Sequence, residues 1–104
     1  MASPRNRTLV LAEADRRAPV PALSGPAQPD HIYCSDAIEG LRRSPAADLI
    51  FADPPYDAAA EWHAEWIAEC ARRLRPEGSI YVCCDWTFSG TIQALLARHF
   101  TVRN

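Results

Sequence analysis

The chain has 104 residues, of which 48% are hydrophobic, and it carries a formal net charge of −2 with a sequence pI of about 5.8. This allows one packed domain at most, and the lack of a basic patch counts against a self-sufficient DNA-binding protein. Because no apolar run approaches the ~18 residues of a membrane span and no signal peptide is evident, we expect a cytoplasmic protein without a membrane partner.

The first 30 residues are expected to lie outside the packed domain. Thr8–Ala12 fits a short strand, and residues 17–30 contain four prolines, which is typical of a linker or an extended arm. We therefore assign residues 1–30 to a proline-rich N-terminal arm or linker and residues 31–104 to the domain.

The domain is expected to begin with a strand, a capped helix and a second strand. His31–Cys34 has a strand-like composition, and Asp36 stands where an aspartate caps the helical stretch Ala37–Arg43. The near-continuous apolar run from Ala46 to Ala52 is typical of a strand that is covered on both faces.

The next helix, over residues 58–74, has a clear apolar stripe. Trp62, Trp66 and Cys70 recur every four residues on one helix face, so we expect the tryptophans to be core residues. Three glutamates fall on another face and are expected to be solvated. These glutamates are Glu61, Glu65 and Glu69.

The end of this helix is rich in arginine. Arg72, Arg73 and Arg75 cluster in its last turn, where cations favour the helix dipole. Pro76 and Gly78 are then expected to end the helix.

The remaining elements continue the alternation of strand and helix. Ser79–Cys84 is the clearest strand in the sequence. A further helix begins at Ser89 or Thr91, and Phe100–Val102 is expected to begin another strand. This order, with short links, predicts an α/β fold with a parallel sheet and flanking helices.

Cysteines and histidines show no spacing that is typical of a metal site. No cysteine pair has Cys-x-x-Cys spacing, and the adjacent Cys83 and Cys84 would face opposite sides of a strand. We therefore expect reduced, buried thiols, with no metal site and no disulfide framework. His31, His63 and His99 have no partner at ligand spacing and are expected to be surface or core residues.

The tetrapeptide Asp53-Pro54-Pro55-Tyr56 follows the predicted strand directly. In open α/β sheets, ligands bind outside the carboxyl ends of the strands. The two prolines have no backbone N–H and keep the residues before them extended, so outward carbonyl oxygens gather beside the Asp53 carboxylate. These acceptors suit an amine or amide NH2, while Tyr56 offers a ring face.

An exocyclic amine on a purine or pyrimidine fits both parts of this arrangement. Accepting hydrogen bonds from both N–H groups would favour a pyramidal nitrogen, whose lone pair is then free to attack an electrophile. A base in a duplex must be flipped out for this, at a cost of roughly a few kcal/mol. Trp86 or Phe88, which follow the next strand, would line the same pocket for base or cofactor. The alternative is a rigid turn, since Asp and Pro are ordinary turn residues.

At these residues the chain resembles the amino-methyltransferases of nucleic acids, which use S-adenosylmethionine. The tetrapeptide Asp53–Tyr56 matches their catalytic motif in full, and an aspartate in the first position is typical of the adenine-N6 enzymes. Residues 32–41 look like the strand and acidic turn before that motif, and residues 74–79 look like the turn after it. The resemblance covers about residues 31–103.

The resemblance implies part of a Rossmann-like methyltransferase fold and a site-specific DNA adenine-N6 methyltransferase of the restriction–modification or orphan kind. Asp53, Pro54, Pro55 and Tyr56 are then the catalytic residues: Asp53 and the Pro54 carbonyl hold the amine, and Tyr56 stacks on the base. Asp36 and Asp53 are the expected contacts of the cofactor S-adenosylmethionine, although Asp36 is equally well explained as a helix cap alone. No metal is implied.

Other functions stay open on the sequence alone. The resemblance also leaves open an RNA base-amine methyltransferase with the same tetrapeptide, or a cytosine-N4 methyltransferase, in which serine is commoner at the first position. The chain could also be a non-catalytic remnant that acts as a structural or interaction module. The oligomeric state is not indicated.

The sequence has no glycine-rich turn for the methionine end of the cofactor. Its glycines stand at positions 25, 40, 78 and 90, and no two are closer than 12 positions. One subgroup of the family places the catalytic half first and the glycine loop downstream. We therefore expect residues 31–104 to be the catalytic half of a truncated domain, with double-stranded DNA bound mainly by regions beyond this chain. Alone, the chain is expected to bind the cofactor weakly and to be inactive.

Overall fold

A computed structural model describes residues 12–14, 20 and 22–103 of the chain. The elements within these residues follow the order α2 (Ala37–Arg43), β1 (Ala47–Ala52), α3 (Ala60–Arg73), β2 (Leu74–Val82) and α4 (Ser89–Leu96). The strand predicted at Thr8–Ala12 lies outside the described residues, apart from Ala12. No helix in this described part is long and apolar enough to cross a lipid bilayer.

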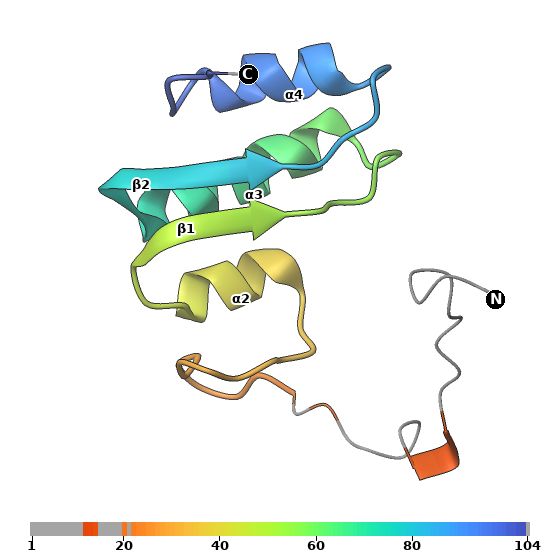
Figure 1. The fold of residues 1–104 in the computed structure, drawn as a ribbon, viewed down its shortest axis with the longest axis vertical. Helices are drawn as coiled ribbons and strands as arrows, with labels where there is room; N and C mark the ends of the chain where they lie inside the picture. Colours follow the sequence, from red (N-terminus) through yellow and green to blue (C-terminus); the bar gives the residue numbers. More distant parts are fainter. Residues whose placement is uncertain (1–11, 15–19, 21, 104) are drawn as a thin grey trace, which may run out of the picture.

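The two strands lie side by side and run in the same direction, with α3 as the connection between them (Figure 1). Leu49 pairs with Ser79, and the register continues until Ala52 pairs with Val82. All three helices begin at the edge of the sheet where the strands end (Figure 1). The predicted α/β fold, with a parallel sheet and flanking helices, is confirmed, and it is consistent with part of a methyltransferase fold.

The core lies between the helices and one face of this sheet. Ile67 and Cys70 of α3 are its most buried apolar side chains, and Trp66 is buried beside them, so the predicted apolar stripe is confirmed. Helices α2 and α4 each contribute apolar side chains on either side of α3. The sheet supplies the side chains of alternate positions on both strands. The residues from outside α3 are Ile38, Leu41, Ile50, Ala52, Ile80, Val82, Leu95, Leu96 and Phe100.

The opposite face of the sheet is uncovered in the described part of the chain. Leu49 and Phe51 of β1 are 59% and 70% exposed, and Tyr81, which pairs with Phe51, is 61% exposed. The expectation that β1 is covered on both faces is therefore wrong here, because α2, α3 and α4 all pack through the same core on its other side. The sequence of β1 nevertheless gives it two apolar faces, as in the buried parallel sheets of α/β proteins.

Two further predicted strands are not formed. His31–Cys34 makes only an isolated bridge, in which Cys34 pairs with Ala22. Phe100–Val102 has no strand partner among the described residues, and the Phe100 N–H instead donates to the Leu96 carbonyl at 2.9 Å, which prolongs the turn after α4. Both segments have strand-like residues, but a strand requires a ladder of hydrogen bonds to a neighbour.

The junction of α3 and β2 differs from the expected turn. The helix ends at Arg73 and β2 begins at once, at Leu74. From Ala47 to Leu49 β1 advances by two residues, while β2 advances by five, from Leu74 to Ser79. Pro76 and Gly78 therefore lie in a bulge within β2, after the helix has already ended.

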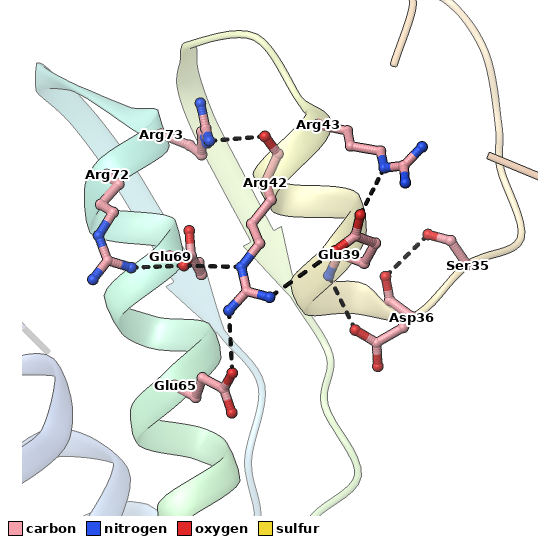
Figure 2. A network of polar contacts seen from close by, with 9 residues as sticks. All are labelled: Ser35, Asp36, Glu39, Arg42, Arg43, Glu65, Glu69, Arg72 and Arg73. Atoms are coloured by element: carbon pink, nitrogen blue, oxygen red, sulfur yellow. Dashed lines mark hydrogen bonds and ion pairs between the residues drawn. The ribbon is translucent and has the colours of Figure 1, made fainter. Parts of the chain in front are cut away.

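Glu69 is buried rather than solvated. Its side chain lies between two arginines (Figure 2): Arg42 of α2 donates to it at 3.3 Å and Arg72 of α3 at 2.7 Å. A carboxylate can be buried when it is paired and hydrogen-bonded in this way. Arg73, at the end of α3, donates to the Arg42 carbonyl of α2 at 2.8 Å, and Arg75, which lies in β2, pairs with Asp48 of β1 at 2.8 Å on the surface.

The cysteines and histidines fall into different environments. Cys34 is exposed, contrary to expectation, while burial raises the pKa of the Cys70 thiol to about 11. His63 is a core residue, and the Trp66 indole N–H donates to its Nδ1 at 3.0 Å. Burial lowers the pKa of His63 below its ordinary value, because the charged imidazolium would lose its hydration.

The bulge in β2 predicts different effects of alanine at two glycines. A Cβ at Gly78 would lie 2.9 Å from the Asp48 carbonyl oxygen and 2.7 Å from the Leu74 side chain, whereas one at Gly90 in α4 meets nothing within 4 Å. Gly78→Ala should therefore lower the free energy of unfolding by about 1–3 kcal/mol. Gly90→Ala should raise it by about 0.5–1 kcal/mol through helix propensity. Urea unfolding measures both, and equal effects of the two substitutions would contradict the bulge.

Candidate active site

The tetrapeptide Asp53–Tyr56 begins where β1 ends, beside the end of β2. The Cys83 N–H donates to the Ala52 carbonyl at 2.8 Å, so the pairing of the strands continues up to the residue before Asp53. Strand β2 itself ends at Val82, two residues earlier than predicted. The two loops that follow the strands leave the sheet at the same edge (Figure 1). Trp86 and Asp53 therefore lie on loops at the same edge of the sheet.

Asp53 and Tyr56 are in contact and open to solvent. The Tyr56 hydroxyl donates to Asp53 Oδ1 at 3.2 Å, and Tyr56 is 43% exposed. This hydrogen bond and the charge of the Asp53 carboxylate raise the pKa of Tyr56, with a smaller effect from Cys83 and Cys84. The two thiols therefore lie near the phenol, a proximity that follows from the strand register and that the sequence analysis did not single out.

The backbone of the tetrapeptide offers free acceptors. Among the described residues, no N–H or hydroxyl donates to the carbonyl oxygens of Asp53 or Pro54, while a turn follows Pro55 at Tyr56 and Asp57. Asp53 caps no helix, and its only bond in this part of the chain is the one from Tyr56. The arrangement can therefore accept hydrogen bonds from an amine, beside an aromatic ring that is accessible from solvent.

Asp36 serves as the N-cap of α2, as the sequence predicts. Its Oδ1 accepts the Glu39 N–H at 3.0 Å, and the Ser35 hydroxyl donates to its backbone carbonyl at 3.0 Å (Figure 2). The second carboxylate oxygen has no hydrogen-bond partner among the residues that the structure describes. The cap uses one oxygen and leaves the other free, so a cofactor contact by Asp36 stays a prediction.

The site is an open edge and not an enclosed cavity. A pocket of about 840 Å³ lies next to β2, between the outer face of the sheet and the residues that follow α4. Phe51, Tyr81, Cys83 and Val102 are among its lining residues, and the tetrapeptide is not. In the described part of the chain, Asp53, Pro55 and Tyr56 are exposed and Pro54 is half-buried, so the tetrapeptide is accessible from solvent.

The chain is similar over part of its length to three DNA methyltransferases. The DNA adenine methyltransferase YhdJ of Escherichia coli (strain K12) is 41% identical over 90 residues. The match covers 70% of this chain and 31% of the relative. The type II methyltransferase M.HpaI of Haemophilus parainfluenzae is 30% identical over 82 residues, which cover 62% of this chain and 26% of the relative. The type II methyltransferase M.BamHI of Bacillus amyloliquefaciens is 29% identical over 91 residues, which cover 70% and 22%.

The chain thus spans less than a third of the length of each of these relatives. No protein-family profile matches it, and no solved structure is significantly similar to it. The similarity establishes partial homology to DNA methyltransferases, including a DNA adenine methyltransferase and two type II methyltransferases.

The two roles of Asp36 predict different results for two substitutions. Asp36→Ala should lower the free energy of unfolding by about 0.5–2 kcal/mol, because the N-cap is lost, while Asp36→Asn should retain the cap and nearly all the stability. If the free oxygen contacts the cofactor, Asp36→Asn should also weaken the binding of S-adenosylmethionine, measured by calorimetry. Unchanged cofactor binding by this stably folded variant would leave Asp36 as a cap alone.

The bond between Tyr56 and Asp53 predicts a late titration of the phenol. Tyr56 should ionise above the ordinary tyrosine pKa of 10.0, because its proton is shared with a carboxylate whose charge opposes the phenolate. Asp53→Ala should return this titration toward pH 10, as followed by ultraviolet absorbance. The absorbance of Tyr56→Phe, which lacks this phenol, is subtracted from that of the wild type to identify the Tyr56 contribution. An unchanged Tyr56 titration in Asp53→Ala would show that the two side chains are not in contact in solution.

Proposed function

We propose that the chain is the catalytic half of a site-specific DNA adenine-N6 methyltransferase, which transfers a methyl group from S-adenosylmethionine to the N6 amine of a flipped adenine. The observation that carries this proposal is the open tetrapeptide, whose acceptors and aromatic ring stand together at the carboxyl edge of a parallel sheet. The partial homology to DNA methyltransferases supports the reaction class. The same proposal assigns the chain to the subgroup that places this tetrapeptide before the cofactor glycine loop.

The residues of the tetrapeptide have separate tasks in this proposal. One N–H of the amine donates to the Asp53 carboxylate and the other to the Pro54 carbonyl, which draws the nitrogen toward a pyramidal geometry and localises its lone pair. Pro55 keeps Pro54 extended, so that this carbonyl stays directed outward. The Tyr56 ring stacks on the base. A base that has left the duplex can adopt this position, and one inside it cannot.

When bound, S-adenosylmethionine would supply a methyl group from a positively charged sulfur, and the neutral thioether would be the leaving group. The amine nitrogen that Asp53 and the Pro54 carbonyl hold would be the nucleophile. The methylated nitrogen would then lose one proton, for which the Asp53 carboxylate is the adjacent acceptor. Asp53 thus first orients the amine and then receives a proton at the same oxygen atoms.

The chain fits the acceptor side of the reaction better than the cofactor side. Asp36 has a free carboxylate oxygen at the start of α2, on the edge where the tetrapeptide lies. No glycine-rich turn that could cradle a methionine tail accompanies the tetrapeptide in the described part of the chain: Gly40 lies within α2, Gly78 in the bulge near the start of β2, and Gly90 stands alone in the first turn of α4. We therefore place most of the cofactor site, and the surface that recognises duplex DNA, in polypeptide other than residues 31–104.

The uncovered sheet face supports this division of the domain. Parallel sheets are normally covered on both faces, yet Leu49, Phe51 and Tyr81 are exposed together on one face. The relatives carry more than two thirds of their length outside the matched region. The same face also favours a second candidate function, a non-catalytic module that binds another protein through this apolar surface.

Substitution of Asp53 separates the two functions. In the protein expressed from its natural reading frame, Asp53→Ala should lower methylation of adenine in DNA by about 10²–10⁴-fold, because both orientation and proton acceptance are lost. Asp57→Ala, which removes an exposed carboxylate of the same loop, is the matched control and should leave the rate nearly unchanged. Incorporation of labelled methyl groups measures the rate. A wild-type protein without methyl transfer, or an Asp53→Ala variant as active as the wild type, would contradict the proposal.

A further inference from the structure

Trp86 is the most exposed large hydrophobic side chain of the described residues. It is 88% exposed, whereas Trp66 is buried in the core and Trp62 is half-buried against it. Exposure of a whole indole is unusual, because tryptophan is on average highly buried. A side chain of this size that the described part of the chain covers so little is therefore a candidate for contact with a ligand.

The loop that carries Trp86 is held in place on both sides. Asp85 Oδ1 accepts the Thr87 hydroxyl at 2.8 Å and the Phe88 N–H at 2.9 Å. The Ser89 hydroxyl donates to the Trp86 carbonyl at 3.0 Å. The Phe88 ring lies 5.2 Å from the buried His63 ring, which anchors the loop to the core. The indole is thus presented to solvent from a backbone that the structure fixes.

This loop borders the tetrapeptide. The strand register brings Ala52 beside Cys83, and the thiols of Cys83 and Cys84 are near enough to affect the Tyr56 phenol. Trp86 follows two residues after Cys84. The two exposed aromatic side chains, Tyr56 and Trp86, therefore come from neighbouring loops at one edge of the sheet.

The charges at this edge select the part of a nucleic acid that fits there. Asp53 and Asp57 are exposed in the first loop, and no arginine or lysine lies in either of the two loops. A phosphate group would be repelled, while an uncharged ring with N–H donors would not. The flat indole therefore suits contact with a nucleobase and not with the phosphate backbone.

We propose that Trp86 stacks on an unpaired nucleobase adjacent to the base whose amine the tetrapeptide holds. This inference rests on the proposed function, since it takes the ligand to be a nucleic acid. Extrusion of one base leaves its neighbours without a stacking partner, and an aromatic face at this position replaces that partner. Stacking tolerates every base because each has a π-face, so Trp86 positions the strand and does not read its sequence.

The uncovered sheet face offers a competing explanation of the exposure, in which Trp86 contacts further polypeptide. Leu49, Phe51 and Tyr81 project from the face of the sheet, but Trp86 lies on the loop beyond the strand end. The two explanations predict different effects of two changes. Trp86→Phe keeps an aromatic face for stacking, and an oligonucleotide without bases offers nothing on which Trp86 could stack.

The test compares three proteins and two oligonucleotides. The protein expressed from its natural reading frame, Trp86→Ala and Trp86→Phe are titrated at low salt with a short single-stranded oligodeoxynucleotide and with an abasic strand of the same length and charge. Tryptophan fluorescence and calorimetry measure binding, and circular dichroism checks that the variants fold. Trp86→Ala should weaken binding of the normal strand about 5- to 150-fold. Trp86→Phe should stay within about threefold of the wild type, and the abasic strand should bind the wild type as weakly as the normal strand binds Trp86→Ala.

Three results would overturn the proposal: no measurable binding of the normal strand by the wild type, equal binding by Trp86→Ala, or equal binding of the abasic strand. The proposed methyl transfer is judged separately, from Asp53→Ala. Stacking by Trp86 in a protein that transfers no methyl group would refute the proposed function and retain this inference. If the wild type transfers methyl groups and Trp86→Ala binds the strand as tightly as the wild type, the proposed function is supported and this inference is refuted.

Discussion

The parallel pairing of β1 and β2 up to their carboxyl ends is the constraint on which the rest of the structure depends. The bond from the Cys83 N–H to the Ala52 carbonyl, at 2.8 Å, closes this pairing immediately before Asp53. Because the strands end level with one another, the two following loops share one edge. The prolines then keep the first loop extended, and Asp85 and Ser89 fix the second. The site is thus positioned by the backbone, before any ligand contributes.

The two faces of this sheet differ in what covers them. One face carries the helices and the core, and the other presents Leu49, Phe51 and Tyr81 to solvent. The tetrapeptide has free hydrogen-bond acceptors and an accessible ring, but no glycine-rich turn accompanies them in the part of the chain that the structure describes. Both features agree with a chain that supplies the amine-holding side of a methyl transfer, while the cofactor side lies in other polypeptide.

Structural features that depend on residues close together in the sequence could be predicted from sequence patterns. The period of the apolar residues located the α3 stripe, and Asp36 was identified as a cap because an aspartate before a helix has a partner within three residues. Contacts between distant segments were not predictable in this way. Glu69 is buried because Arg42 reaches it from α2, 27 residues earlier, and His31–Cys34 lacks the neighbour that would make it a strand. The apolar sequence of β1 shows that two faces can be covered, but not what covers the second.

The central claim is that Asp53 and the Pro54 carbonyl accept the two hydrogen atoms of a nucleobase amine while Tyr56 stacks on the ring. The most direct measurement is a crystal structure of the protein with bound adenosine. The account predicts that N6 lies about 2.7–3.2 Å from an Asp53 carboxylate oxygen and from the Pro54 carbonyl oxygen, with the purine against the Tyr56 ring. An adenosine whose amine faces solvent, or which binds away from this edge of the sheet, would contradict it.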